Sequence, residues 1–368
     1  MNKKKFIAAA AAVGVAASLF GVASPANAEP VSASYVVVGS DTLQDVLNAL
    51  SNGTNITGGF VRSTGGSFNV GSFDATGSVS IQTKSGGVRF GRPNGSGDGV
   101  RALSRSIDGA NYTSATPGGP ANVNITGQVD IARSSSGATA VANGPLLYIP
   151  FGRDALSYAH SGGTNAAFDN IDQATLKGIF ECTITTVGGV TVVPVIPQSG
   201  SGTRADFLSK AGIGTLGACV QVGQEHDTKF LADGTTPFPD NAVTPMSAAQ
   251  WVAQNTGAGI DRRGAGVELG SPIAGTPAVT GTGTAMVPNA PYYANTTWGR
   301  DTYIVVENAR VTVGDPKYDA NLANVVSNAA SKLGNSQSVL PSQAGSVKKK
   351  FGFLAPSTTT PFRAALRA

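Results

Sequence analysis

The chain contains little histidine, little cysteine and little charge. Only His160 and His226 occur among 368 residues, and charged residues make up 13% of the sequence. The chain has no Gly-x-Ser-x-Gly elbow, and its histidines lie outside any nucleophile motif, which argues against a hydrolase. His226 stands between Glu225 and Asp227 and could act as a general base, but we interpret this stretch as a solvated acidic loop. We therefore expect a protein that is not an enzyme.

Two cysteines exclude a zinc site of the usual kind. Cys182 and Cys219 stand far apart in sequence, and no histidine lies at ligand spacing from either. We expect no metal and no cofactor. An even pair of cysteines in an exported chain instead favours a Cys182–Cys219 disulfide.

After residue 28 the chain also lacks an apolar run of about 18 residues, the length that a membrane-spanning helix needs. Residues 1–28 have the three parts of a secretory signal: Lys3-Lys4-Lys5, the apolar stretch 6–22, and the small-residue site Ala26-Asn27-Ala28. We expect cleavage after about Ala28, a secreted, extracytoplasmic protein, and no stable membrane insertion.

The positive charge of the chain belongs mostly to this signal. Removal of its three lysines changes the formal charge from +4 to +1. A nearly neutral protein has no electrostatic footprint for nucleic acid, so we expect no nucleic-acid partner. The remaining roughly 340 residues exceed what one hydrophobic core usually serves, which predicts two lobes.

The most informative stretch is residues 198–208, Gln-Ser-Gly-Ser-Gly-Thr-Arg-Ala-Asp-Phe-Leu. It follows the strand-like run 192–196 and opens an amphipathic segment. A Ser/Gly loop between a strand and a helix directs several backbone N–H groups at one point, where the helix dipole favours an anion. Arg204 adds a fixed positive charge. The same composition is typical of a linker, so a plain turn is the alternative.

Two other junctions have the same character. Val36-Val37-Val38 runs into Gly39-Ser40-Asp41-Thr42, ahead of apolar residues at helical spacing. Asn94-Gly95-Ser96-Gly97-Asp98-Gly99 precedes Val100 and Leu103. Together the three junctions predict an anion held between helix ends, and three ordinarily capped helices are the alternative.

The remaining pattern alternates strands and helices, which predicts the α/β class. We expect strands at 79–83, 129–132, 146–151 and 303–306, and helices at 97–106, 172–180, 247–254 and 319–333. The strand at 146–151 is expected to cross into a second lobe and that at 303–306 to return. The lysines of 348–350 are expected to be solvated.

With these segments in view, the chain resembles the phosphate-binding extracytoplasmic solute-binding proteins of ABC transporters, of the actinobacterial type. The segments that carry the resemblance are 39–42, 95–100, 129–135, 199–204 and 176–180, in matching order over most of residues 33–310.

The resemblance implies an α/β, two-lobe periplasmic-binding-protein-like fold, a Venus flytrap of class II. Residues 29–148 and 299–368 would form lobe 1, and residues 149–298 would form lobe 2. A monomer would capture inorganic phosphate or another oxyanion between the lobes, for uptake by an ABC permease. The expected ligand-binding residues are Ser40, Thr42, Leu43, Ser96, Arg133, Ser134, Ser135, Ser201, Gly202, Thr203 and Arg204.

Two departures from the family pattern leave the anion open. Ser135 stands where the family has an aspartate that accepts a proton of the ligand, and Pro197-Gln198 stand where it has an arginine. A buried carboxylate disfavours an oxyanion without a proton, so its loss weakens the case for phosphate. Arg133 and Arg204 are the candidates to supply charge. The alternative function is a structural or interaction protein that keeps the fold without a ligand.

Overall fold

The computed structural model describes residue 30 and residues 32–51, 68–340 and 343–368, so the predicted signal segment 1–28 lies outside the described residues. The strands are β1 (Tyr35–Gly39), β2 (Val70–Ser72), β3 (Ser80–Ile81), β4 (Phe90–Gly91), β5 (Asn111–Tyr112), β6 (Val123–Asn124), β7 (Ile131–Ser134), β8 (Leu146–His160), β9 (Thr186–Val187), β10 (Val190–Thr191), β11 (Val193–Pro197), β12 (Gln221–Gly223), β13 (Ala242–Ser247), β14 (Glu268–Gly270), β15 (Val279–Thr280), β16 (Val287–Pro288), β17 (Gly299–Glu307) and β18 (Phe362–Ala364).

The helices alternate with these strands. They are α2 (Gln44–Ser51), α3 (Ser96–Asp108), α4 (Gln173–Phe180), α5 (Gly202–Ala211), α6 (Ala248–Thr256), α7 (Ala290–Tyr293), α8 (Asn308–Val311), α9 (Ala320–Val325) and α10 (Ala344–Lys350), with 3-10 turns η1 (Asp41–Leu43), η2 (Ala166–Phe168) and η3 (Gly283–Ala285). None of the described helices is both long and apolar enough to span a membrane.

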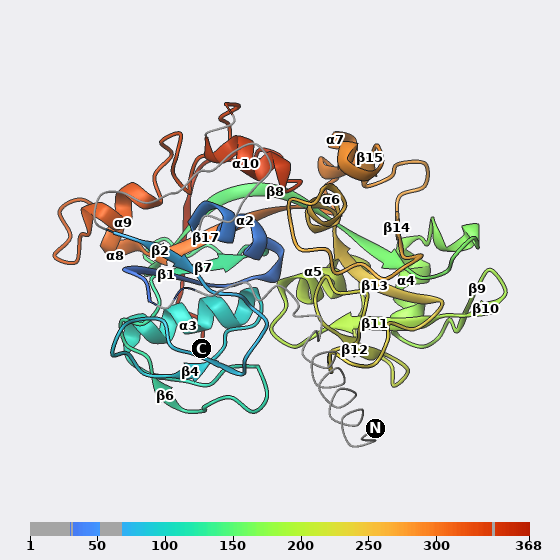
Figure 1. The fold of residues 1–368 in the computed structure, drawn as a ribbon, viewed down its shortest axis with the longest axis horizontal. Coiled ribbons are helices and arrows are strands. Elements are labelled where there is room, and N and C mark those ends of the chain that lie inside the picture. Colours follow the sequence, from blue (N-terminus) through green and yellow to red (C-terminus); the bar gives the residue numbers. More distant parts are fainter. Residues whose placement is uncertain (1–29, 31, 52–67, 341–342) are drawn as a thin grey trace, which may run out of the picture.

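A ten-stranded mixed sheet connects two lobes. Its strand order is β12–β11–β13–β8–β17–β7–β1–β2, and β14 and β18 also pair with β8. Figure 1 shows β1, β2 and β7 in one lobe and β11, β12 and β13 in the other. This architecture confirms the α/β, two-lobe fold expected from the sequence.

The strands β8 and β17 pass through both lobes side by side. They are antiparallel, and their pairing continues from Gly299↔Ala155 to Glu307↔Leu146. The register shifts between Thr302 and Tyr303, opposite Gly152 and Pro150. The crossing strand and the returning strand expected from the sequence are therefore these two, although β8 is longer than expected.

Each lobe has its own hydrophobic core. In lobe 1, alternate residues of β1 point to opposite faces of the sheet. Val37 packs with Leu47 of α2 on one face, and Val36 packs with Leu103 of α3 on the other. In lobe 2, Phe207 of α5 belongs to a cluster with residues of α4 and β11. Because both faces of the sheet are covered, the loops at its strand ends are left to form the site.

The disulfide and the helices expected at 172–180 and 247–254 in lobe 2 are confirmed, and the helices are α4 and α6. Cys182 and Cys219 form a disulfide. Asp172 caps α4 by accepting a hydrogen bond from Thr175 N at 2.7 Å, and Ser247 caps α6 through Gln250 N at 3.1 Å. These caps satisfy N–H groups that the first turn of a helix leaves without partners.

The helix expected at 319–333 is wrong beyond Val325. Asp319 does cap α9, but the chain then turns, and Leu333 N donates back to Val325 O at 3.0 Å. Ser327 donates from its side chain to Asn324 O at 2.8 Å. Short polar side chains compete in this way with the helical hydrogen-bond pattern.

The expectation that all three C-terminal lysines are solvated is also wrong. Lys348 is buried, and its ammonium donates to Phe151 O at 2.8 Å and Leu333 O at 2.7 Å. The amphipathic turn of α10 places Val347 and Lys348 inward and leaves Lys349 exposed. Burial lowers the pKa of Lys348 well below its usual value.

Candidate functional site

The three strand-to-helix junctions meet where the lobes face each other. Ser40-Asp41-Thr42 follows β1, and an isolated bridge joins Gly39 to Asn94, ahead of α3. Gly97 N, in the first turn of α3, donates to Gly200 O in the loop before α5 at 3.1 Å. This hydrogen bond connects lobe 1 to lobe 2, so the described structure is closed.

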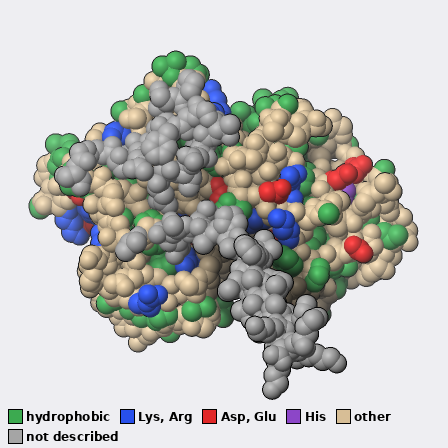
Figure 2. Space-filling model, in the orientation of Figure 1, with side chains coloured by type: hydrophobic (Ala, Val, Ile, Leu, Met, Phe, Trp, Pro, Cys, Tyr) green, Lys and Arg blue, Asp and Glu red, His purple; other side chains and the backbone are tan. Residues whose placement is uncertain are grey.

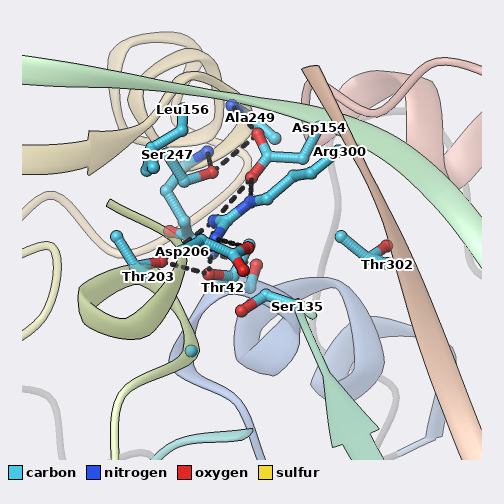
Figure 3. A network of polar contacts seen from close by, with 12 residues as sticks. Thr42, Ser135, Asp154, Leu156, Thr203, Asp206, Ser247, Ala249, Arg300 and Thr302 are labelled. Atoms are coloured by element: carbon cyan, nitrogen blue, oxygen red, sulfur yellow. Dashed lines mark hydrogen bonds and ion pairs between the residues drawn. The ribbon is translucent and has the colours of Figure 1, made fainter. Parts of the chain in front are cut away.

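Two threonine hydroxyls and one arginine lie at the centre of this contact. Thr42 Oγ1 of lobe 1 is 3.3 Å from Thr203 Oγ1 of lobe 2. Arg300 Nη2 donates to Thr203 Oγ1 at 2.9 Å and to Thr42 Oγ1 at 3.3 Å. Figure 3 shows Arg300 directed from the returning strand β17 toward both threonines. The pairing of hydroxyls with a guanidinium is a donor set suited to an oxyanion.

Arg300 is held in place by two carboxylates. Its Nε and Nη2 donate to Asp154 Oδ2 at 3.0 and 2.8 Å, and its Nη1 donates to Asp206 Oδ2 at 3.1 Å. Asp154 also accepts hydrogen bonds from Ser247 Oγ and Ala249 N. Burial lowers the pKa of Arg300, but the attraction of Asp154 and Asp206 outweighs burial and raises it. Arg300 is therefore a permanent cation.

Glu225 and His226 complete the central cluster, by which we mean Thr42, Thr203, Glu225, His226 and Arg300. Thr42 Oγ1 donates to Glu225 Oε1 at 3.1 Å, and His226 Nε2 lies 3.1 Å from both of these oxygens. Both side chains are buried. The interpretation of this stretch as a solvated loop is therefore wrong, because closure of the lobes covers it.

The carboxylate of Glu225 is ionised at neutral pH. Burial raises the pKa of Glu225, but the attraction of His226 and hydrogen bonds from His226, Ser201 and Thr203 outweigh burial and lower it to about 2. The neighbouring Asp41 behaves in the opposite way. Burial and the negative charge of Glu225 raise the pKa of Asp41 well above its usual value, so that Asp41 retains its proton more readily.

Two serines of lobe 1, Ser96 and Ser135, face the first turn of α5 in lobe 2. Ser96 Oγ lies 3.0 Å from Ser135 Oγ and accepts a hydrogen bond from Ser135 N at 3.0 Å. Ser201 caps α5 by accepting from Arg204 N at 2.9 Å. A Cβ atom on Gly202 would lie 2.4 and 2.5 Å from the oxygens of Ser96 and Ser135. Glycine at 202 thus permits the close approach of the two lobes.

Gln198 forms an uncharged bridge between the lobes. Its Nε2 donates to Asn94 Oδ1 at 2.6 Å, and its Oε1 accepts from Glu225 N at 2.8 Å. The amide therefore connects the α3 junction of lobe 1 to the Glu225 loop of lobe 2.

The other predicted residues lie around this centre. Arg133 is buried within lobe 1 and donates to Ser72 Oγ, Gly39 O and Phe73 O at 2.6, 3.0 and 2.9 Å. Arg204 donates to Pro197 O at 3.0 Å. Ser40 and Leu43 are buried, Leu43 in the lobe 1 core, and Ser134 Oγ donates to Ser136 O at 2.7 Å.

A cavity of about 470 Å³ lies beside the central cluster and between the lobes. Its lining includes Ser96, Ser134, Ser136, Ser201, Gly202, Arg204 and Arg367. Five of the predicted residues thus share one cavity wall, and Thr42 and Thr203 lie in the neighbouring polar cluster.

Sequence reasoning missed Arg300, Asp154 and the role of Glu225. Arg300 begins the returning strand among the small and polar residues Gly299, Asp301 and Thr302. The available signal was the position of this arginine, a cation at the point where a strand passes from one lobe to the other. On the face shown in Figure 2, charged side chains are scattered and form no single basic patch over the described residues.

Comparisons with known proteins give a match in structure alone. No protein-family model matches the chain, and no curated protein matches its sequence. The structure is similar to a Clostridium perfringens protein solved with bound phosphate and described as a phosphate ABC transporter substrate-binding protein. The TM-score is 0.51 at 12% identity, over 88% of this chain and 99% of that one. An ABC-type phosphate transport receptor from Vibrio cholerae aligns over 88% of this chain and 100% of its own, with a TM-score of 0.49 and 14% identity. The likeness to the Clostridium perfringens protein establishes the fold.

Proposed function

We propose that this protein is an extracytoplasmic solute-binding protein, of the actinobacterial type, that captures phosphate or a related oxyanion between its two lobes for uptake by an ABC permease. One observation carries the proposal. Hydroxyls from helix-initiating junctions of both lobes, Thr42 and Thr203, converge on the guanidinium of Arg300. Charge-assisted hydrogen bonds to an oxyanion are the strongest that such groups can make.

The position of Arg300 supports an anion in spite of the missing family arginine. Its guanidinium comes from β17 and not from the loop before α5. It donates to both Thr42 and Thr203. Arg204, on the wall of the 470 Å³ cavity, is a second cation within reach of an entering solute. Asp154 and Asp206 both pair with Arg300 and balance the charge of the two arginines, so the solute would be held by hydrogen bonds from these groups and not by an excess of positive charge.

Closure around the solute would involve the two strands that pass between the lobes. The register shift in β17 at Thr302/Tyr303, opposite Pro150 and Gly152 of β8, interrupts the regular ladder. Such an interruption concentrates bending at a few residues, as hinge closure requires. We therefore propose that the hinge lies here, close to the boundaries between lobe 1, residues 29–148 and 299–368, and lobe 2, residues 149–298.

The test is titration calorimetry of the cleaved protein with phosphate, sulfate and a panel of other oxyanions. Gly202→Ala should abolish binding, because its Cβ would push against Ser96 and Ser135 in the closed state. Gly214→Ala is the matched control, since the nearest atom to its Cβ would be Glu181 Oε1 at 4.0 Å. Absence of heat with every oxyanion at millimolar concentration would refute oxyanion capture.

A second candidate is a structural or interaction protein that keeps the fold without a solute. The observation that favours it is the internal pairing of the cluster: Arg300 contacts Asp154 and Asp206, and Thr42 contacts Glu225. In that case native mass spectrometry of protein purified from its own secretions should find no retained anion, and Gly202→Ala should leave the binding of any partner unchanged.

A further inference from the structure

The carboxylate of Glu225 lies among the hydroxyls that the proposed function assigns to the solute. Its Oε1 accepts from Thr42 Oγ1 of lobe 1 at 3.1 Å, and Thr203 Oγ1 of lobe 2 lies 3.3 Å from the same Thr42 hydroxyl. A carboxylate and a solute oxyanion present the same kind of acceptor oxygens to such donors. Glu225 therefore occupies the position of an anion in the closed state.

The contact of Glu225 crosses from one lobe to the other. Glu225 belongs to the loop that follows β12 in lobe 2, whereas Thr42 follows β1 in lobe 1. The loop is fixed at its backbone, because Glu225 N donates to Gln198 Oε1 and His226 O accepts from Gln254 Nε2 at 3.0 Å. The Thr42–Glu225 bond can thus hold the lobes together in the absence of a solute.

A small polar cavity adjoins the carboxylate. It measures about 50 Å³ and is lined by Asp41, Gln44, Glu225, His226, Gln250 and Arg262, among others. Glu225 Oε2 and Asp41 Oδ2 are both buried and make no hydrogen bond with any described residue. The cavity therefore offers the Glu225 side chain a second position.

Two groups in that cavity suit a carboxylate that leaves the cluster. The carboxyl of Asp41, whose pKa is raised by burial and by Glu225, can donate a hydrogen bond while it is protonated. Arg262 contributes a cation, which lies 3.5 Å from Asp45. A displaced Glu225 would therefore remain paired, which lowers the cost of moving it.

We propose that the Glu225 carboxylate is an internal ligand of the oxyanion site, which holds the lobes closed without a solute and is displaced into the adjoining cavity when a solute anion binds. This inference rests on the proposed function. Its consequence is competitive: the apparent affinity for an anion is reduced by the fraction of molecules in which Glu225 occupies the cluster.

The first measurement is titration calorimetry with sodium phosphate and sodium sulfate in a carboxylate-free buffer. Glu225→Gln keeps the size of the side chain and removes its charge, so a solute anion meets a weaker competitor. We expect at least tenfold tighter binding of the anion than in the wild type. Asp240→Asn is the control, because it removes one negative charge from an exposed position in the same lobe, and it should leave the affinity unchanged. Equal or weaker binding by Glu225→Gln would overturn the inference.

The second measurement is small-angle X-ray scattering without any anion. The wild type and Asp240→Asn should scatter as the closed structure does, and Glu225→Gln and Glu225→Ala should have a larger radius of gyration. Identical radii for all four proteins would show that Glu225 does not hold the lobes. If no protein binds phosphate, sulfate or any other oxyanion of the panel, the proposed function and the displacement step both fail, and the scattering still decides whether Glu225 bridges the lobes.

Discussion

Arg300 and Asp154 form a buried ion pair whose two members should be strongly coupled. Their side chains are 4% and 0% exposed, and two guanidinium nitrogens donate to the same carboxylate oxygen. Removal of one partner from such a pair leaves an uncompensated charge and costs about 3–5 kcal/mol. In Arg300→Met, Asp154 keeps its donors Ser247 and Ala249. We therefore expect the free energy of unfolding to fall by about 3 kcal/mol, the lower end of that range.

A double-mutant cycle measures this coupling. Urea unfolding can be followed by the fluorescence of Trp298, which is buried in the lobe 2 core. The loss of unfolding free energy in the double variant Arg300→Met/Asp154→Asn should be roughly 1–3 kcal/mol smaller than the sum of the losses in the two single variants. Lys177→Met, which breaks a partly exposed pair with Glu181, should cost far less than Arg300→Met. Strictly additive losses, or a loss for Arg300→Met as small as that of the control, would refute the buried pair.

Three other expectations can be measured by unfolding. Loss of the Cys182–Cys219 disulfide in a double serine variant should lower the free energy of unfolding by roughly 4 kcal/mol, the loop-closure estimate for a separation of 37 residues; an unchanged urea midpoint would contradict it. Because burial lowers the folded-state pKa of Lys348, the unfolded chain binds more protons below pH 10.5, and stability should rise with pH toward that value. Lys348→Met should lose this slope and Lys349→Met should keep it; equal slopes in both would argue against a buried ammonium. The folded-state pKa of Glu225 is lowered from 4.5 to about 2, so its stabilisation is complete above 4.5 and is lost as pH falls toward 2. The stability difference between wild type and Glu225→Gln should shrink over that interval, and a constant difference would exclude the ionised carboxylate.

The parts of the site that could be predicted from sequence are those with local signals. The helices at 172–180, after 201 and at 247–254 have such signals, because Asp172, Ser201 and Ser247 are short polar residues at their starts, and each accepts a backbone hydrogen bond as a cap. Strands β8 and β17 were recognisable because their apolar runs are strong. The fold class followed from the alternation of these elements.

The charges of the site could not be predicted in this way. Arg300 reaches Thr203 only because β17 returns between the lobes. The hydrophobic periodicity of the sequence contains no information on such a contact between distant residues. Glu225 and His226 have the composition of a solvated loop, and their burial depends on closure of the lobes. The helix predicted beyond Val325 failed for a related reason, since Leu333 pairs back to Val325 and tertiary packing overrides local propensity.

The two shared strands also determine the order in which the protein can assemble during synthesis. β17 emerges long after β7, its partner in lobe 1, and β18 then adds to β8 from near the carboxyl end, with Phe362 stacked on Tyr148 at 5.0 Å between ring centroids. Lobe 2 can acquire most of its sheet while lobe 1 still lacks two strands. A nascent chain would therefore expose the unpaired edge of β7 until β17, in the last third of the chain, has been made. We would look for chaperone contact or aggregation at this edge.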